Sequence, residues 1–370
     1  MAKPIFVSGI LILISTIIAF PVLADYHFSN FKGRPPIHIY GSSSKKPLGL
    51  SPEQVKAAYN LPATGGHGTI VIIGAYDDKT IEDDLNVFSQ TFNLPECTIA
   101  NGCFEKHKMS DSVKPSSGWS METSLDVEWA HAIAPKAKIL LVEATTPSGK
   151  NLLDAIDYAA GRTDAAAVSM SWGGGEFPEE ATMDSHFISK SGAVFFASSG
   201  DDGTGVSWPA ASANVVAVGG TSLKLDAKNK VVSETAWAGS GGGISVYEKQ
   251  PAYQSGYGIA KAGGMRAIPD VSLNADPQNG FAIYKSSSGG KGIWYRVGGT
   301  SASAPQWAAI RSLGLSASNE KFYSDKASEN YSTYFRDIVS GKNGDCGYLC
   351  MARKRYDYVT GLGSPLTVNF

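Results

Sequence analysis

Short apolar runs alternate with stretches in which apolar residues recur at helical spacing along much of the chain. The runs are short and nearly uninterrupted, as in strands buried on both faces of a parallel sheet. They predict strands over residues 69–75, 138–142, 166–171 and 193–198. The helical spacing predicts helices over residues 50–59, 81–92, 119–135, 152–160, 181–191 and 302–315. This alternation predicts an α/β fold of three layers, a mainly parallel central sheet with helices on both faces.

The last predicted helix begins in a segment of small residues, Gly299-Thr300-Ser301-Ala302-Ser303-Ala304-Pro305. Small residues let a substrate backbone approach closely, and a proline in the first helical turn costs little because its missing N–H has no partner there. Ser301 therefore lies near the positive end of a helix dipole, where a developing oxyanion is favoured. Because a serine hydroxyl is a weak nucleophile by itself, Ser301 needs a base.

Two acids share one face of the helix predicted over residues 119–135. Glu122 and Asp126 are four residues apart, so their side chains are neighbours. Adjacent carboxylates resist joint ionisation and can hold a proton between them, which makes them a base suited to acidic conditions. By spacing alone, two solvated acids on an amphipathic helix are the more common case. We interpret Glu128 and His131 on the same helix as supporting or solvent-facing residues.

A third acid follows the strand predicted over residues 193–198. Asp201 lies in the turn-forming cluster Ser199-Gly200-Asp201-Asp202-Gly203. Ligand sites of open parallel sheets gather at the carboxyl ends of the strands, and a protonated Asp can donate a hydrogen bond to an oxyanion. Without such a role, Asp201 would be an ordinary Asx-turn residue.

These segments together resemble the sedolisins, the serine-carboxyl peptidases with a subtilisin-like fold. The resemblance extends from residue 49 to residue 365. It includes Glu-x-x-x-Asp at residues 122–126, Ser-x-Ser-Trp-Gly at 169–173, Ser-Gly-Asp-x-Gly at 199–203 and Gly-Thr-Ser-x-x-x-Pro at 299–305. What it implies is a secreted serine-type peptidase, an endopeptidase or tripeptidyl-peptidase, that acts on proteins or peptides at acidic pH.

The resemblance also implies a role for each residue. Ser301 would be the nucleophile that forms an acyl-enzyme. Glu122 would be the general base, and Asp126 would orient and polarise it. Asp201 would stabilise the oxyanion of the tetrahedral intermediate. The residues beside the bound substrate strand would be Ser171, Trp172, Gly173 and Gly174.

A further part of the resemblance lies near the C-terminus. Residues 360–365 match the family's Thr-Gly-Leu-Gly-x-Pro turn, which accompanies a calcium site, and the match implies one structural Ca²⁺ here. Carboxylates and backbone carbonyls are suitable ligands, although the cationic segment 353–355, where the family usually has glycines, disfavours a bound cation. The implied ligands are the carboxylates of Asp337 and Asp357 and the main-chain carbonyls of Ile338, Arg353 and Arg355.

Two other functions stay open. His67-Gly68-Thr69 resembles the histidine motif of the subtilases, but it leads into a strand, and His131 lies on the helix of the acids. Either histidine would make a neutral Ser-His-Asp hydrolase. The other alternative is a catalytically silent peptide-binding relative, which the altered calcium segment and the lack of a recognisable large prodomain favour. Asp78 is a weak candidate for a further acid coupled to the catalytic acids.

The N-terminus predicts export. Lys3, the apolar run over residues 5–20 and the small residue Ala24 predict a signal peptide over residues 1–24. We expect a linker or N-terminal arm over residues 25–49 and a peptidase domain over residues 50–370. A membrane anchor is the alternative for the apolar run, but the cleavage pattern favours a signal and no stable membrane association afterwards.

Charge and cysteine content agree with an exported enzyme. The 32 basic and 34 acidic side chains give a net charge of −2, and no basic run indicates a nucleic-acid partner. We expect a monomer in an extracellular, periplasmic or acidic lumenal compartment. The four cysteines form two close pairs, Cys97/Cys103 and Cys346/Cys350, which predict local disulfides although three connectivities are possible.

Overall fold

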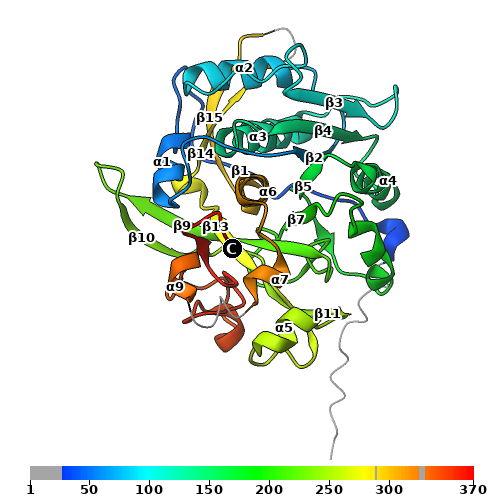
Figure 1. Cartoon of the computed structure of the whole chain (residues 1–370), viewed down its shortest axis with the longest axis vertical. Helices are drawn as coiled ribbons and strands as arrows, with labels where there is room; N and C mark the ends of the chain where they lie inside the picture. Colours follow the sequence, from blue (N-terminus) through cyan, green and yellow to red (C-terminus); the bar gives the residue numbers. More distant parts are fainter. Residues whose placement is uncertain (1–26, 288–289, 325–329) are drawn as a thin grey trace, which may run out of the picture.

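The computed structural model describes residues 27–287, 290–324 and 330–370, and an eight-stranded sheet forms its centre (Figure 1). The strand order is β10-β9-β7-β5-β2-β4-β3, with β13 beside β9. Every neighbouring pair is parallel except β10 and β9, so the mainly parallel sheet is confirmed. The strands are β2 (Thr69–Ala75), β3 (Phe104–Lys108), β4 (Lys138–Ala144), β5 (Ala165–Met170), β7 (Val194–Ser198), β9 (Val215–Leu225), β10 (Val231–Ala236) and β13 (Val271–Asn274).

Helices cover both faces of this sheet, as the side chains of β2 show. Ile70 and Ile72 pack in one core with residues of α3 and α6, whereas Val71 and Ile73 pack in a second core with residues of α4. All of β2 is buried, as expected for a strand between two helical layers. The helices of the first layer are α1 (Pro52–Ala58), α2 (Ile81–Thr91), α3 (Ser117–Ile133) and α6 (Thr300–Gly314), and the second contains α4 (Gly149–Gly161).

Local sequence accounts for the start of α1 and for one wrong prediction. Ser51 is the N-cap of α1 and forms a capping box with Gln54, three residues further on. Pro52 occupies the first helical position. The α-helix predicted over residues 181–191 is instead the 3-10 helix η2 (Glu180–Phe187). The side chains of Glu180 and Thr182 bond to nearby backbone groups, and such bonds compete with regular helical ones.

Small two- and three-stranded sheets flank the main sheet, and the sequence pattern did not predict them. In the three-stranded one, β1 of the N-terminal arm pairs with β15, which leads directly into α6. The remaining strands are β1 (His38–Ile39), β6 (Gly174–Gly175), β8 (Ser207–Trp208), β11 (Gly243–Lys249), β12 (Met265–Ile268), β14 (Phe281–Lys285), β15 (Ile293–Gly298), β16 (Phe335–Arg336) and β17 (Ser364–Pro365). The remaining helices are η1 (Phe28–Asn30), α5 (Ala252–Tyr257), η3 (Pro277–Asn279), α7 (Asn319–Phe322), α9 (Tyr331–Tyr334) and η4 (Gly347–Cys350).

Both close cysteine pairs are disulfides, Cys97–Cys103 and Cys346–Cys350. The predicted local pairing is therefore the one, of the three possible connectivities, that the protein adopts. The predicted signal peptide lies outside the described residues. None of the helices in the described ranges combines the length and the apolar character that crossing a bilayer requires.

Candidate active site

The two acids of α3 are buried together. Glu122 and Asp126 are each 2% exposed, because α3 packs against both the sheet and α6 and residues 122–133 are all buried. This burial excludes the alternative of two solvated acids. Glu128 and His131 are fully buried as well, so neither faces solvent.

Ser301 is the second residue of α6 and is fully buried. Its hydroxyl donates a long bond of 3.4 Å to the carbonyl oxygen of Ser171. The same hydroxyl lies close enough to Glu122 to lower its pKa against the effect of burial. Neither carboxylate oxygen of Glu122, however, completes a hydrogen bond of good geometry within the described residues. Loose contacts of this kind are common between a nucleophile and its base before substrate binds.

Burial raises the pKa of Glu122 and of Asp126 well above the usual range, and for Glu122 the charge of Asp126 adds to the rise. The Ser171 hydroxyl lies 2.6 Å from Oδ1 of Asp126, to which it donates, and 3.1 Å from the carbonyl oxygen of Ser301. Ser171 thereby links the acid pair to the start of α6. Such a pair keeps protons at pH values where exposed carboxyl groups have lost them.

Asp201 follows β7, in the loop beside the start of α6. Its Oδ1 accepts bonds of 2.8 Å from the Thr300 N–H and 2.7 Å from the Thr300 hydroxyl. Its Oδ2 lies 3.0 Å from Nε2 of His38. Burial raises the pKa of Asp201, and the contacts with His38 and Thr300 oppose this rise. A protonated Asp201 would be a hydrogen-bond donor at the end of the helix that carries Ser301.

Gly299 separates Asp201 from the N-terminal arm. Its φ of +118° is a conformation that favours glycine. A Cβ at this position would lie 2.1 Å from the carbonyl oxygen of Pro36 and 2.5 Å from Oδ2 of Asp201. A larger residue would therefore push both groups away from the start of α6.

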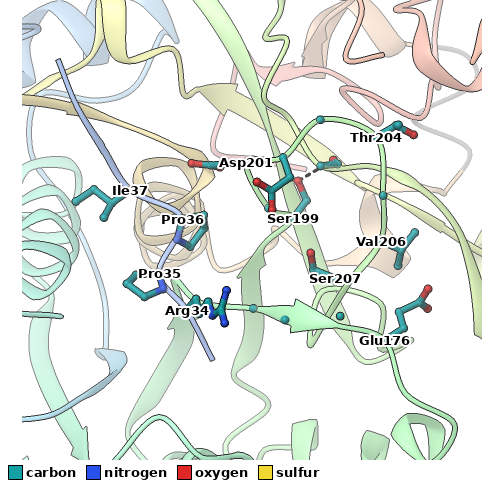
Figure 2. A pocket seen from close by; sticks show the side chains of 18 of the residues that line it. Arg34, Pro35, Pro36, Ile37, Glu176, Ser199, Asp201, Thr204, Val206 and Ser207 are labelled. Carbon is teal, nitrogen blue, oxygen red and sulfur yellow. Dashed lines mark hydrogen bonds between the residues drawn. The ribbon is translucent and has the colours of Figure 1, made fainter. Parts of the chain in front are cut away.

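A cleft of about 780 Å³ opens beside Asp201 (Figure 2). Residues 34–38 form one side, and residues 173–176 and 199–207 form the other walls. Of the predicted substrate-binding residues, Gly173 and Gly174 line the cleft. Ser171 and Trp172 are fully buried, and the Trp172 indole donates a bond of 3.0 Å to the Ile73 carbonyl. The structure thus brings two of the four predicted residues to the cleft surface.

Comparison with known proteins identifies the family. The model of the subtilase family matches residues 51–331. This chain belongs to the subtilase family. The resemblance to the sedolisins is confirmed by the relatives that it matches. The structure of this chain is similar to the solved structure of Pseudomonas sedolisin, a serine-carboxyl proteinase complexed with two molecules of pseudo-iodotyrostatin. The TM-score is 0.73 at 26% identity, over 88% of this chain and 96% of the other.

Curated relatives of this subtilase are longer than the chain itself. Kumamolisin of Bacillus sp. (strain MN-32) is 30% identical over 88% of this chain and 64% of its own length. Sedolisin of Pseudomonas sp. (strain 101) is 28% identical over 85% of this chain and 60% of its own length. The chain therefore spans less than two thirds of each relative.

Neither histidine of the alternative hypothesis bonds to Ser301 in the described structure. The main chain of His67 bonds to Ser312, towards the other end of α6. His131 bonds through Nε2 to the Pro95 carbonyl at 2.9 Å, and burial lowers its pKa to about 4. The described contacts of the Ser301 hydroxyl are with the Ser171 carbonyl and Glu122, and no described histidine is bonded to it.

His38 is a neighbour of Asp201 that sequence reasoning missed. No motif surrounds it, and it precedes Asp201 by more than 160 residues. The ion pair with Asp201 exists only because β1 pairs with β15 at the entrance to α6. The pKa of His38 is raised, chiefly by its hydrogen bond with Asp201.

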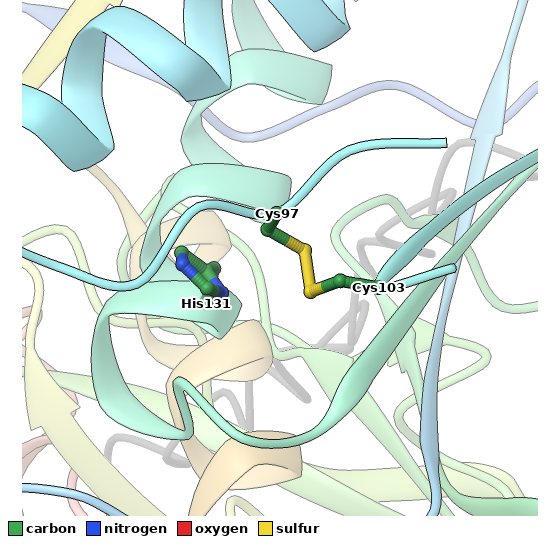
Figure 3. Close-up of side chains that lie close together, drawn as sticks. All are labelled: Cys97, Cys103 and His131. Carbon is green, nitrogen blue, oxygen red and sulfur yellow. A yellow bond between two sulfur atoms is a disulfide. The ribbon is translucent and has the colours of Figure 1, made fainter. Parts of the chain in front are cut away.

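His131 also lies beside the first disulfide (Figure 3). Potential ligand atoms of Cys97, Cys103 and His131 are all within 4.8 Å of one another. Because the two sulfurs are bonded to each other, neither can serve as a thiolate ligand. This cluster is therefore not a metal site in the oxidised protein.

Asp78 takes part in an ion pair instead of coupling to Glu122. Nζ of Lys285 lies 2.9 Å from Oδ2 of Asp78 and 2.8 Å from Oδ2 of Asp84. This buried cation between two acids ties β14 to the start of α2. The weak prediction of a further catalytic acid at Asp78 receives no support from these contacts.

The predicted calcium ligands lie around one loop. The Arg353 N–H donates to Oδ2 of Asp357 at 3.0 Å, and the Arg355 N–H donates to Oδ1 of Asp337 at 2.8 Å. The segment between the two arginines therefore brings both carboxylates to one main-chain loop. Ile338, next to Asp337, is also buried. Carboxylate oxygens are ligands that suit Ca²⁺, but in the described structure these two accept bonds from main-chain N–H groups.

Proposed function

We propose that this chain is a peptidase of the serine-carboxyl class, which hydrolyses proteins or peptides in acidic surroundings. One observation carries the proposal: Glu122 and Asp126 are buried as a pair beside Ser301, and Asp201 lies at the same end of α6. Four side chains from three distant segments would not meet in this way through burial of apolar surface alone.

The mechanism assigns one task to each group. The Ser301 hydroxyl attacks the substrate carbonyl carbon while Glu122 accepts the hydroxyl proton. Asp126, held by Ser171, orients Glu122 and stabilises the transferred proton. A protonated Asp201 donates a hydrogen bond to the oxyanion.

The same groups complete the cycle. Glu122 returns its proton to the leaving amine, which departs and leaves an acyl group on Ser301. Water then attacks the acyl carbon, again with Glu122 as base, and Ser301 regains its proton. Because Asp201 acts as a donor only when protonated, the mechanism favours acidic pH.

Other candidates receive less support. A catalytically silent peptide-binding relative would have no need to retain all of Ser301, Glu122, Asp126 and Asp201. A neutral Ser-His-Asp hydrolase needs a histidine bonded to Ser301, and the contacts of His67 and His131 lie elsewhere.

We further propose that the enzyme is exported. The signal-like sequence of residues 1–24 and two disulfides are typical of proteins from oxidising compartments. Activity after secretion agrees with a mechanism that needs acid, because extracytoplasmic compartments can be acidic.

We propose one structural calcium ion. Its ligands would be the carboxylates of Asp337 and Asp357 and the main-chain carbonyls of Ile338, Arg353 and Arg355. A bound ion would neutralise the buried Asp357, which is 2% exposed. Removal of calcium with EGTA is then expected to lower the melting temperature by several degrees, since loss of a ligand of the folded state destabilises it. Differential scanning calorimetry measures the shift. The Asp357→Asn variant is the control and should respond less; identical melting temperatures with and without EGTA would exclude the site.

The proposed activity is tested by mass spectrometry of the products from a mixed peptide library at acidic pH. Internal cuts would identify an endopeptidase, and release of tripeptides from free N-termini would identify a tripeptidyl-peptidase. Absence of any product would refute the proposal.

A further inference from the structure

A second pocket lies between the end of α5 and the C-terminal loops, which are beside each other in Figure 1. Its volume is about 410 Å³, and residues 256–260, 323–324, 348, 354–356 and 358 line it. The cleft beside Asp201 and this pocket share no lining residue in the described ranges. The pocket is therefore separate from the candidate active site.

The charged side chains of this pocket are cations. Lys354 and Arg355 line it and are both exposed, and no acidic side chain is among its described lining residues. Two more cations lie over the ring of Tyr348, with Nζ of Lys261 at 4.3 Å and Cζ of Arg353 at 4.2 Å from the ring centroid. Because the whole chain has a net charge of −2, four cations at one pocket form a local positive region that attracts an anion.

Two of these cations have an unusual main-chain conformation. The angle φ is +69° at Lys261 and +65° at Arg355, in the left-handed region that favours glycine and asparagine. Residues held in this region tend to occur at ligand sites, where the surrounding structure fixes them. An asparagine would adopt either conformation more readily, so the pocket places charged side chains where the main chain alone favours a neutral one.

Four tyrosines complete the walls, namely Tyr257, Tyr323, Tyr356 and Tyr358. The ring planes of Tyr257 and Tyr323 are inclined by 77°. Those of Tyr356 and Tyr358 are inclined by 82°. Walls inclined in this way form no slot for a flat base, but they can pack against the C–H groups of a puckered ring. The Arg355 side chain bonds to the Tyr257 hydroxyl, so a cation lies directly beside these aromatic walls.

The main chain around the pocket is unsuited to an extended peptide. The lining residues belong to the end of α5, to η4 and to loops, and none of them lies in a described strand. A peptide would therefore find no strand edge with which to pair. The volume suits a small ligand of one or two rings.

We propose that this pocket binds an acidic sugar, a saccharide unit whose ring carries a carboxylate. The carboxylate binds to Arg355 and Lys354, since guanidinium and ammonium groups donate charge-assisted hydrogen bonds to it. The apolar face of the sugar ring packs against Tyr257 and Tyr356. Such a site would attach the enzyme to an anionic polysaccharide without the participation of Ser301 or the cleft.

Isothermal titration calorimetry with trigalacturonate tests the proposal in calcium-containing buffer at about pH 5, where carboxylates are ionised. The full chain carries Ser301→Ala to prevent self-digestion. We expect saturable binding with a Kd below about 1 mM. The Lys261→Asn/Arg355→Asn variant should bind about tenfold more weakly or worse, because asparagine tolerates the same φ and has no charge. The matched control is Lys228→Asn/Lys230→Asn, which removes two exposed cations elsewhere and should bind like the parent.

Three other ligands separate the contributions of ring and charge on the unaltered pocket. Methyl-esterified trigalacturonate keeps the rings without the charges, triglutamate has carboxylates on a peptide, and inorganic phosphate has charge without a ring. Each should bind about tenfold more weakly than trigalacturonate or worse. Equal affinity for any of the three would overturn the proposal, as would undetectable binding of trigalacturonate.

Unchanged affinity in Lys261→Asn/Arg355→Asn would also overturn the proposal. If this variant melts several degrees below the parent, Lys354→Ala is the milder replacement, because Lys354 is exposed and its φ is not positive. The readout is separable from that of the proposed peptidase function, since binding is measured without turnover. A chain that binds trigalacturonate and cleaves no peptide would retain this site and lose the proposed activity.

Discussion

Replacement of Ser301 by Ala, of Glu122 by Gln or of Asp201 by Ala is expected to lower kcat at acidic pH by on the order of a hundredfold or more. Each change removes one element of the reaction: the attacking hydroxyl, the group that takes its proton, or the donor to the oxyanion. Steady-state kinetics on a chromogenic peptide measure the effect.

Glu128→Gln is the matched control, because Glu128 is a buried acid on the same helix. Its Oε2 accepts the Tyr284 N–H at 3.0 Å, away from Ser301, and an amide oxygen can accept the same bond. We expect kcat within about threefold of the parent, since no reacting atom is touched. Near-normal turnover in Glu122→Gln would refute its role as base.

The second large effect concerns stability. The melting temperature is expected to fall by at least about 5 °C between pH 5 and pH 8. Burial raises the pKa of Glu122, Asp126 and Glu128 in the folded protein. An acid of this kind contributes stability that is complete below its unfolded pKa of about 4 and is lost as pH rises towards the folded pKa.

His131 changes the pH dependence of stability in the opposite direction over part of this range. Its pKa falls to about 4 on folding, so it adds stability as pH rises to its unfolded pKa of about 6.5. Comparison with the Glu122→Gln/Asp126→Asn double variant cancels this contribution, since both proteins contain His131. Calorimetry should show that the melting temperature of the double variant, relative to that of the wild-type protein, increases as pH rises. A difference in melting temperature between the two proteins that stays constant across pH would show that the pKa values of the acid pair do not change on folding.

The sequence predicts the parallel sheet well because its strands are buried on both faces. Residues 69–75 are uniformly apolar or small, and β2 has the predicted bounds. The short strands that flank the sheet carry no such signal, since β6 has two glycines and β1 is exposed. The 3-10 form of η2 depends on side chains that bond to the backbone, which apolar periodicity does not register.

For the candidate site, the motifs predict which residues take part, and the fold accounts for their burial and contacts. Spacing alone favours solvated acids at Glu122 and Asp126, and the packing of α6 against α3 buries them. Contact between Asp201 and Thr300 joins segments that are 99 residues apart. His38 is beyond prediction from sequence, because its place depends on the pairing of β1 with β15.

The central claim is that carboxyl groups, and no imidazole, activate the Ser301 hydroxyl. The pH profile of kcat/KM on a denatured protein substrate tests it most directly. The account predicts a maximum below about pH 5 and a decline towards neutrality as Asp201 loses the proton that it donates to the oxyanion. A maximum near neutral pH that disappears in His67→Ala or His131→Ala would contradict it.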